Sequence, residues 1–280
     1  KTGRNVVVLI DEYDKPMLQA IGNEDLQIQF RNMLKAFYGT LKSADGYLRF
    51  VLLTGVTKFS KLSIFSDLNN IEDISMEKQY CDICGITEEE LHNVFDNEVA
   101  LLAENNEQTK EEAYKELKKR YDGYHFSENS VGIYNPFSIL LALKNSNYGS
   151  YWFSTGTPTY LVELLKRFDY SLENLSGYEA SATTLDSIQL NVDNPIPVLY
   201  QSGYLTIKGY DRELRLYTLD FPNEEVEEGF VNFLIPMYTS VSEMDSPSFI
   251  GKFVREVRAG KVDDFMRRLQ RMMADTPYEI

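Results

Sequence analysis

The stretch Val6–Pro16, VVVLIDEYDKP, decides how the fold of this chain is interpreted. Five apolar residues, most of them β-branched, run directly into Asp11 and Glu12, and Pro16 suits the first turn of a helix. A short, continuous apolar run is typical of a strand buried on both faces of a parallel sheet. The pattern therefore predicts a strand over Asn5–Ile10 that ends in two carboxylates.

A helix and a second strand follow in the sequence. Apolar residues recur at intervals of three and four over Leu26–Leu41, which indicates an amphipathic helix. The stretch YLRFVLLTG then predicts a second buried strand that ends at Thr54. In open α/β sheets, ligands bind outside the carboxyl ends of the strands. Asp11, Glu12 and Thr54 are therefore expected on one rim of the sheet.

The remainder of the chain is predicted to be mostly helical, after one more short strand near Gln79–Ile83. Residues 194–230 differ, because a short helix ended by Gly203 precedes a hairpin of YLTIK and LRLYTL, and Pro222 starts another helix. This order resembles a winged-helix module. Capping boxes and prolines mark four further helix starts, at Thr87–Glu90, Thr109–Glu112, Pro136 and Thr157–Pro158.

Composition narrows the possible functions. A net charge of −15 disfavours DNA binding unless cations gather on one face, and the best candidate is Lys252–Arg271. We interpret that segment as a solvated helix face with Val254, Val257, Val262 and Phe265 turned inward. No apolar run approaches the roughly 20 residues of a membrane span. Two cysteines and the lack of a signal-peptide pattern indicate a reducing, cytoplasmic location.

Two other motifs invite a chemical interpretation that the sequence does not support. Cys81 and Cys84 form a C-x-x-C pair, but a structural zinc site needs two more ligands, and His92 and His125 are the chain's two histidines. Packed thiols are the simpler interpretation. A Ser/His/Asp nucleophile system is equally unsupported, and His125 is expected to pack or to make hydrogen bonds within a turn.

The acid pair suits the chemistry of a magnesium–nucleotide site. Such a site needs a carboxylate at a strand end to hold the metal, and a neighbouring acid to orient or deprotonate the attacking water. Asp11 and Glu12 fit these roles, and Thr54 could hydrogen-bond the γ-phosphate or the water. Lys58 and Lys61 could offset phosphate charge. The alternative is that the acids cap the next turn and that both lysines are solvated.

Several stretches distributed along the sequence resemble those of a known family. Eight stretches occur in order: VVVLIDEYDKP, FVLLTGVTKFSKLSIFSDLNNIEDIS, CGITEEEL, YDGYHFS, YNPFSILLAL, YWFSTGTPTYLVELL, LYQSGYLTIKGY and LDFPNEEVEEGF. Together they resemble the bacterial AAA-ATPase-like family, whose members commonly end in a PD-(D/E)XK nuclease-like domain. The resemblance covers nearly the whole chain, and the ordered set is far more specific than any one stretch.

The resemblance implies that VVVLIDEYD is the Walker B strand of an ATPase that uses ATP and Mg²⁺. Asp11 would hold Mg²⁺ when nucleotide is bound, Glu12 would be the catalytic base, and Lys58 would contact the nucleotide. Thr54 falls where a sensor residue belongs, although Thr57 is close enough to leave that assignment open.

The chain departs from the family pattern in two respects. It contains no G-x-x-x-x-G-K-[ST] loop, so the amides and the Lys that bind phosphates are absent. The nuclease-like part is also missing, since Glu116–Lys118 lies in a helical stretch. By this comparison the chain is a central fragment, and no nucleotide is expected bound to it.

The predicted fold class is α/β followed by mostly α: a partial P-loop NTPase core of the AAA/STAND-like kind, a helical lid and a winged-helix-like module. These three parts are placed at 1–85, 86–185 and 186–280. The leading hypothesis is an ATP-hydrolysing regulatory protein, and the alternative is a non-catalytic interaction scaffold with a degenerate ATPase fold. We expect a protein partner or self-association, no membrane contact, and nucleic acid only through the missing nuclease-like domain.

Overall fold

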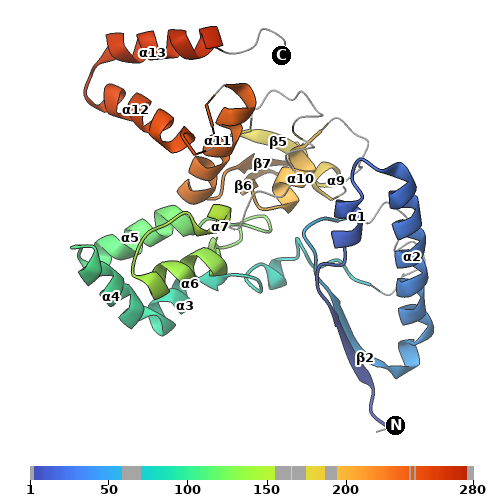
Figure 1. Cartoon of the computed structure of the whole chain (residues 1–280). Coiled ribbons are helices and arrows are strands. Elements are labelled where there is room, and N and C mark those ends of the chain that lie inside the picture. Colours follow the sequence, from blue (N-terminus) through green and yellow to red (C-terminus); the bar gives the residue numbers. More distant parts are fainter. Residues whose placement is uncertain are drawn as a thin grey trace. The chain divides into compact units, whose positions relative to one another are not determined.

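The computed structural model describes residues 3–58, 71–154, 165, 175–186, 194–239, 241–242 and 244–275 (Figure 1). The chain forms two compact units, each made from separate stretches. Unit 1 comprises Lys1–Thr87, Tyr124–Ile133 and Pro158–Asp220, and unit 2 comprises Glu88–Gly123, Tyr134–Thr157 and Phe221–Ile280. The three consecutive parts proposed from the sequence stay a prediction, and the helix expected from Thr157–Pro158 lies almost wholly outside the described residues.

Unit 1 begins with the predicted strand–helix–strand arrangement. Its elements are β1 (Val6–Ile10), α1 (Lys15–Gln19), α2 (Glu24–Ser43), a 3-10 turn (Asp45–Tyr47) and β2 (Leu48–Leu53). The two strands are parallel, and Ile10 lies opposite Leu53. Asn23 caps α2, because its side chain accepts a hydrogen bond from the Leu26 amide at 3.0 Å. The carboxyl ends of β1 and β2 therefore lie next to each other, as the pattern predicts.

The prediction that both faces of these strands are buried was wrong. Val6, Val7 and Leu9 on β1 and Phe50 on β2 are between 52% and 67% exposed. Within the described part of unit 1, β1 and β2 pair only with each other, so little else is present to cover their apolar side chains. The structure thus has an apolar sheet surface that the sequence pattern assigns to an interior.

The short strand predicted near Gln79–Ile83 is not formed either. Lys78–Tyr80 is a 3-10 turn, and successive turns continue to Gly85 through backbone hydrogen bonds such as Ile83 N–H to the Tyr80 carbonyl at 3.2 Å. Local i,i+3 pairing therefore takes the place of strand pairing here. Two-residue strands follow later, β3 (Ile86–Thr87) and β4 (Ile133–Tyr134).

A three-stranded antiparallel sheet forms the other part of unit 1. Its order is β5–β7–β6, with β7 in the centre. The hairpin of β6 and β7 and the helix α10 match the prediction, whereas β5 was not predicted. Gly203, which follows α10, has a left-handed φ of 82° that glycine adopts without strain. The elements in chain order are β5 (Tyr178–Ser181), α9 (Ala182–Leu185), α10 (Ile196–Gln201), β6 (Thr206–Asp211) and β7 (Leu216–Asp220).

Unit 2 is built from helices. Thr109 and Glu112 form the predicted capping box at the start of α5, and Asn135 caps α6 ahead of Pro136. Buried side chains such as Phe230 make up the core of the unit. The helices are α3 (Glu88–Val94), α4 (Asp96–Asn105), α5 (Lys110–Tyr121), α6 (Pro136–Asn145), α7 (Tyr151–Ser154), α11 (Glu224–Tyr238), α12 (Ser246–Arg258) and α13 (Val262–Asp275).

The last two helices, α12 and α13, contact each other through aromatic rings. The ring centroids of Phe253 and Phe265 are 5.5 Å apart. The prediction that Val254, Val257 and Val262 turn inward was wrong, since all three are exposed. The aromatic side chains occupy the contact between the helices, which leaves the valines at the surface.

None of the helices in the described parts of the chain combines the length and the apolar character needed to cross a bilayer.

Candidate functional site

The carboxyl ends of β1 and β2 bring Asp11 and Thr54 into direct contact. The Thr54 hydroxyl donates a hydrogen bond to Asp11 Oδ1 at 2.7 Å. Backbone bonds fix this pair, because Thr54 N–H donates to the Ile10 carbonyl at 2.8 Å and Tyr13 N–H donates to the Thr54 carbonyl at 3.0 Å. The sheet pairing therefore continues past the strand ends and holds a carboxylate and a hydroxyl together at the rim.

Glu12 lies beside this pair in an unusual backbone conformation. Its φ is 52°, in the left-handed region, and its N–H donates to Asp11 Oδ1 at 2.9 Å. Left-handed conformations at residues other than glycine are strained, and such strain is often found at functional sites. Glu12 Oε2 accepts a hydrogen bond from Lys15 Nζ at 2.6 Å, and this contact raises the pKa of Lys15. The Glu12 carboxylate is exposed, so a ligand could replace the lysine.

The two threonines that the sequence left as alternative sensor residues have different surroundings. Thr54 contacts Asp11 at the rim, whereas Thr57 is buried and donates its hydroxyl hydrogen bond to Asp14 Oδ2 at 2.7 Å. Asp14 is the residue of this site that the sequence analysis missed. Its position just before a helix is also that of an ordinary helix cap, so the sequence offers no signal for its contact with Thr57.

Lys58 is held away from the acid pair. Its ammonium group lies 2.9 Å from Asp73 and 3.0 Å from Asp186, and its N–H donates to Gln201 Oε1 at 2.6 Å. The structure brings Asp11, Glu12 and Thr54 together but not Lys58, whose predicted nucleotide contact would require these ion pairs to open. Lys61 lies outside the described residues.

The rim has the ligand chemistry of a magnesium–nucleotide site but not a complete metal cage. Carboxylate and hydroxyl oxygens suit Mg²⁺, which usually binds through one or two carboxylates together with water and phosphate oxygens. Nowhere in the residues that the structure describes do three or more His, Cys, Asp or Glu side chains group so as to hold a metal ion. A metal ion at Asp11 would therefore need further ligands from water or from a bound phosphate.

The remaining polar motifs have structural contacts. Cys81 and Cys84 are free thiols. The His92 ring stacks on Tyr114 with centroids 3.9 Å apart, and His125 Nδ1 is 2.8 Å from the Ser130 carbonyl oxygen. The His125 contact lies within a turn, as expected from the sequence, whereas Cys84 is exposed and does not fit the packed-thiol interpretation.

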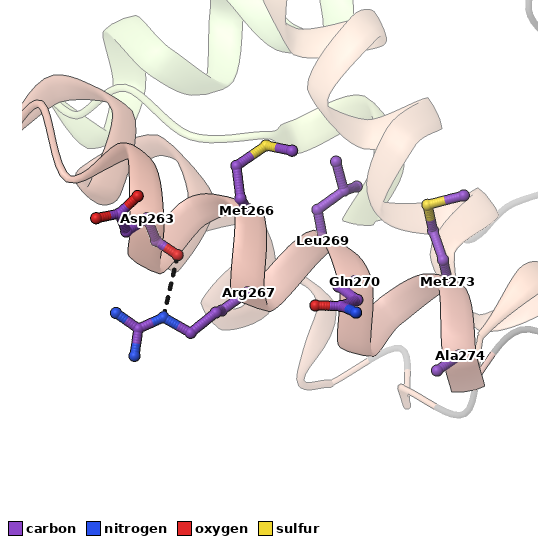
Figure 2. A pocket seen from close by; sticks show the side chains of 7 residues that line it. All are labelled: Asp263, Met266, Arg267, Leu269, Gln270, Met273 and Ala274. Atoms are coloured by element: carbon purple, nitrogen blue, oxygen red, sulfur yellow. Dashed lines mark hydrogen bonds between the residues drawn. The ribbon is translucent and has the colours of Figure 1, made fainter.

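The side chains of α13 line a pocket (Figure 2). Arg267 lies along it and donates a hydrogen bond from Nε to the Asp263 carbonyl at 3.2 Å. All the residues that line it come from this one helix, and none is among the predicted site residues. It therefore gives no indication of a nucleotide site. Its lining residues are Asp263, Met266, Arg267, Leu269, Gln270, Met273 and Ala274.

Comparison with known proteins supports the AAA-ATPase-like family for the first part of the chain. Residues 1–65 match the model of a family described as predicted AAA-ATPase. A protein of Azotobacter chroococcum mcd 1, described as an uncharacterized protein in the vnfD 5′ region, is 36% identical over 241 residues. That match covers 84% of this chain and 44% of the relative, so the chain spans less than half of the relative's length. No solved structure matches the chain significantly.

Proposed function

We propose that this chain contributes the Walker B half of a nucleotide-binding core to an ATP-hydrolysing AAA-ATPase-like regulatory protein. The observation that carries the proposal is the contact of Asp11 with Thr54 at the carboxyl ends of two parallel strands. The family match covers this segment, and Glu12, which directly follows Asp11, has an exposed carboxylate that contacts Lys15.

Each residue of the rim has a role in this proposal. Asp11 would hold the Mg²⁺ that accompanies ATP, and the metal would balance the charge of the phosphates. Glu12 would orient or deprotonate the attacking water once it is released from Lys15. Thr54 would sense the γ-phosphate or the water through its hydroxyl. Lys58 would reach the nucleotide only after leaving Asp73 and Asp186.

The exposed strands support the view that the core continues beyond these residues in the whole protein. Apolar β-branched side chains such as Val6, Val7 and Leu9 stabilise a sheet when other strands or helices cover them. The sequence also lacks the phosphate-binding loop. We therefore propose that other segments of the whole protein cover β1 and β2 and supply the phosphate contacts, and that the 280-residue chain alone binds ATP weakly.

The three-stranded part of unit 1 is proposed to be a winged-helix-like module. Its strand order β5–β7–β6, with α9 and α10 between the first strand and the hairpin, suits this assignment. Helix α10 contains neither Lys nor Arg, so we assign the module to protein contact or to a lid function and not to DNA recognition. The nuclease-like tail and its action on nucleic acid are inferred from the resemblance alone.

The test uses the whole natural protein that contains this chain, with phosphate release from MgATP and nucleotide affinity measured separately. Glu12→Gln should reduce turnover by about 100-fold or more while the affinity for MgATP changes little, because a general base acts in the chemical step. Glu24→Gln, an exposed acid at the start of α2, serves as the matched control and should behave like the wild type.

Unchanged turnover in Glu12→Gln would remove the base assignment. A wild-type protein that binds no MgATP and releases no phosphate would refute the proposed function and favour the interaction scaffold. A separate titration of the 280-residue chain by calorimetry should show no micromolar binding. Micromolar binding by the chain alone would show that it contains phosphate contacts of its own.

A further inference from the structure

Asp14 has a fully buried carboxylate in a place where an ordinary helix cap is exposed. It precedes α1, yet its side chain makes no capping hydrogen bond to that helix. It is 1% exposed and lies near the buried Tyr38, whose pKa is raised by burial and by the charge of Asp14. Burying a carboxylate is unfavourable unless hydrogen bonds compensate for the lost water. The partners of Asp14 therefore indicate what the residue does.

Those partners all belong to the short segment that follows β2. Asp14 Oδ2 accepts hydrogen bonds from the Thr57 N–H at 2.6 Å and from the Thr57 hydroxyl at 2.7 Å. Asp14 Oδ1 accepts a third from the Val56 N–H at 3.2 Å. Three donors on two neighbouring residues fix the position of this segment against the start of α1, because each hydrogen bond constrains both its direction and its distance.

The segment between Thr54 and Thr57 has little freedom to move independently. A Cβ atom added to Gly55 would lie 2.5 Å from Asp14 Oδ1 and 2.7 Å from the Tyr13 ring, so the backbone passes directly against these side chains. Tyr13 holds both ends, because its N–H donates to the Thr54 carbonyl at 3.0 Å and its hydroxyl donates to the Thr57 carbonyl at 2.7 Å. A shift of Thr57 is thus transmitted to Thr54.

We propose that Asp14 is a positioning residue that holds the Thr54 hydroxyl on Asp11, through the Thr54–Thr57 segment, in the geometry that nucleotide hydrolysis requires. This inference rests on the proposed function. Because its carboxylate oxygens are bonded to Val56 and Thr57, Asp14 would act without contacting the nucleotide or the metal. It sets the distance between the predicted sensor and the predicted metal ligand, on which the rate of the chemical step depends.

The test compares variants of the whole natural protein in steady-state MgATP hydrolysis. Asp14→Asn places an amide NH₂ where an oxygen now accepts a hydrogen bond, so it should lower kcat about 10-fold or more while KM stays within about 2-fold. Thr57→Val keeps the shape of the side chain and its N–H bond, and it should lower kcat by about 3-fold. Asp45→Asn, an exposed acid just before β2, is the control and should match the wild type.

A double-mutant cycle separates positioning from general destabilisation. If Asp14 acts through Thr54, adding Asp14→Asn to Thr54→Ala should lower kcat less than about 2-fold further, because the geometry that Asp14 maintains is already lost. Full additivity of the two losses, or a KM that rises as much as kcat falls, would overturn the positioning role while leaving the proposed function intact. A wild type that neither binds nor hydrolyses MgATP would overturn both.

Discussion

The buried hydroxyl of Tyr134 offers a sharp test of the packing of unit 2. It donates a hydrogen bond to Glu88 Oε2 at 2.8 Å, and the tyrosine is fully buried. Tyr114 makes the same kind of bond, 2.8 Å to Asp96 Oδ1, from a less buried position. The two tyrosines thus share donor, acceptor type and distance, and they differ in burial.

Replacing each tyrosine by phenylalanine should therefore have unequal effects. A hydrogen bond to a charged group contributes about 1.5–3 kcal/mol, and the partial exposure of Glu88 puts Tyr134→Phe near the lower limit, at about 1.5 kcal/mol. Tyr114→Phe should cost about 0.5 kcal/mol, because water can replace the hydroxyl at a partly exposed carboxylate. The stacking of Tyr114 on His92 is retained, since phenylalanine keeps the ring.

Urea unfolding measures the difference. Trp152, the chain's one tryptophan, belongs to unit 2, so its fluorescence follows the unfolding of that unit. With a slope of about 2 kcal/mol per molar urea, Tyr134→Phe should lower the midpoint by about 0.75 M, and Tyr114→Phe by about 0.25 M. Equal shifts, or a larger shift for Tyr114→Phe, would refute the argument that burial decides the value of these bonds.

Three further predictions concern stability. Gly229→Ala should destabilise unit 2 by about 1–3 kcal/mol, because the new Cβ would lie 2.1 Å from the Phe153 ring. In the control Gly39→Ala, the new Cβ has no atom within 4 Å, and the substitution should stabilise α2 by up to about 1 kcal/mol. Unfolding of both variants is followed by circular dichroism. Thr109→Ala should cost about 1 kcal/mol in urea unfolding through loss of the capping box, and a cost near zero would contradict the cap. Burial acts to raise the pKa of Glu88, but hydrogen bonds from its lysine and tyrosine partners outweigh it and hold the pKa below the usual value. The resulting stabilisation is present above the unfolded pKa of about 4.5 and is lost as pH falls through the folded pKa, so unit 2 should weaken steadily in tryptophan-monitored unfolding below about pH 4.5.

Elements specified by local sequence signals could be predicted, and those that depend on distant partners could not. The βαβ order, the cap at Thr109 and the helix at Pro136 follow from periodicity and capping residues that lie within a few positions. The prediction of a strand at Gln79–Ile83 was wrong because local turns form backbone hydrogen bonds in this segment. The edge strand Tyr178–Ser181 was missed because its four residues, YEAS, lack an alternating apolar pattern, and its pairing with β7 spans about 40 residues of sequence.

The candidate site divides in the same way. Asp11, Glu12 and Thr54 follow from the rule that ligands gather at the carboxyl ends of parallel strands. Asp14 does not, because an acid in front of a helix with proline in its first turn resembles an ordinary cap. Its true partner, Thr57, is 43 positions away and becomes visible only when β1 and β2 are paired. For Lys58 the sequence suggested a contact that the structure does not show. A lysine beyond a strand end suggests a phosphate contact, but Lys58 forms ion pairs, one of them with the distant Asp186.

The interleaved make-up of the two units has a consequence for biosynthesis. Unit 1 includes residues up to Asp220, and unit 2 includes residues up to Ile280. Neither unit can therefore be completed while the first third of the chain is being translated. Contacts such as those of Lys58 with Asp186 and Gln201 can form only after these later residues have been translated, so we expect the nascent chain to stay partly ordered until then. No single proteolytic cut can separate the two units, and a protein cleaved once within either of them should stay associated through the remaining contacts.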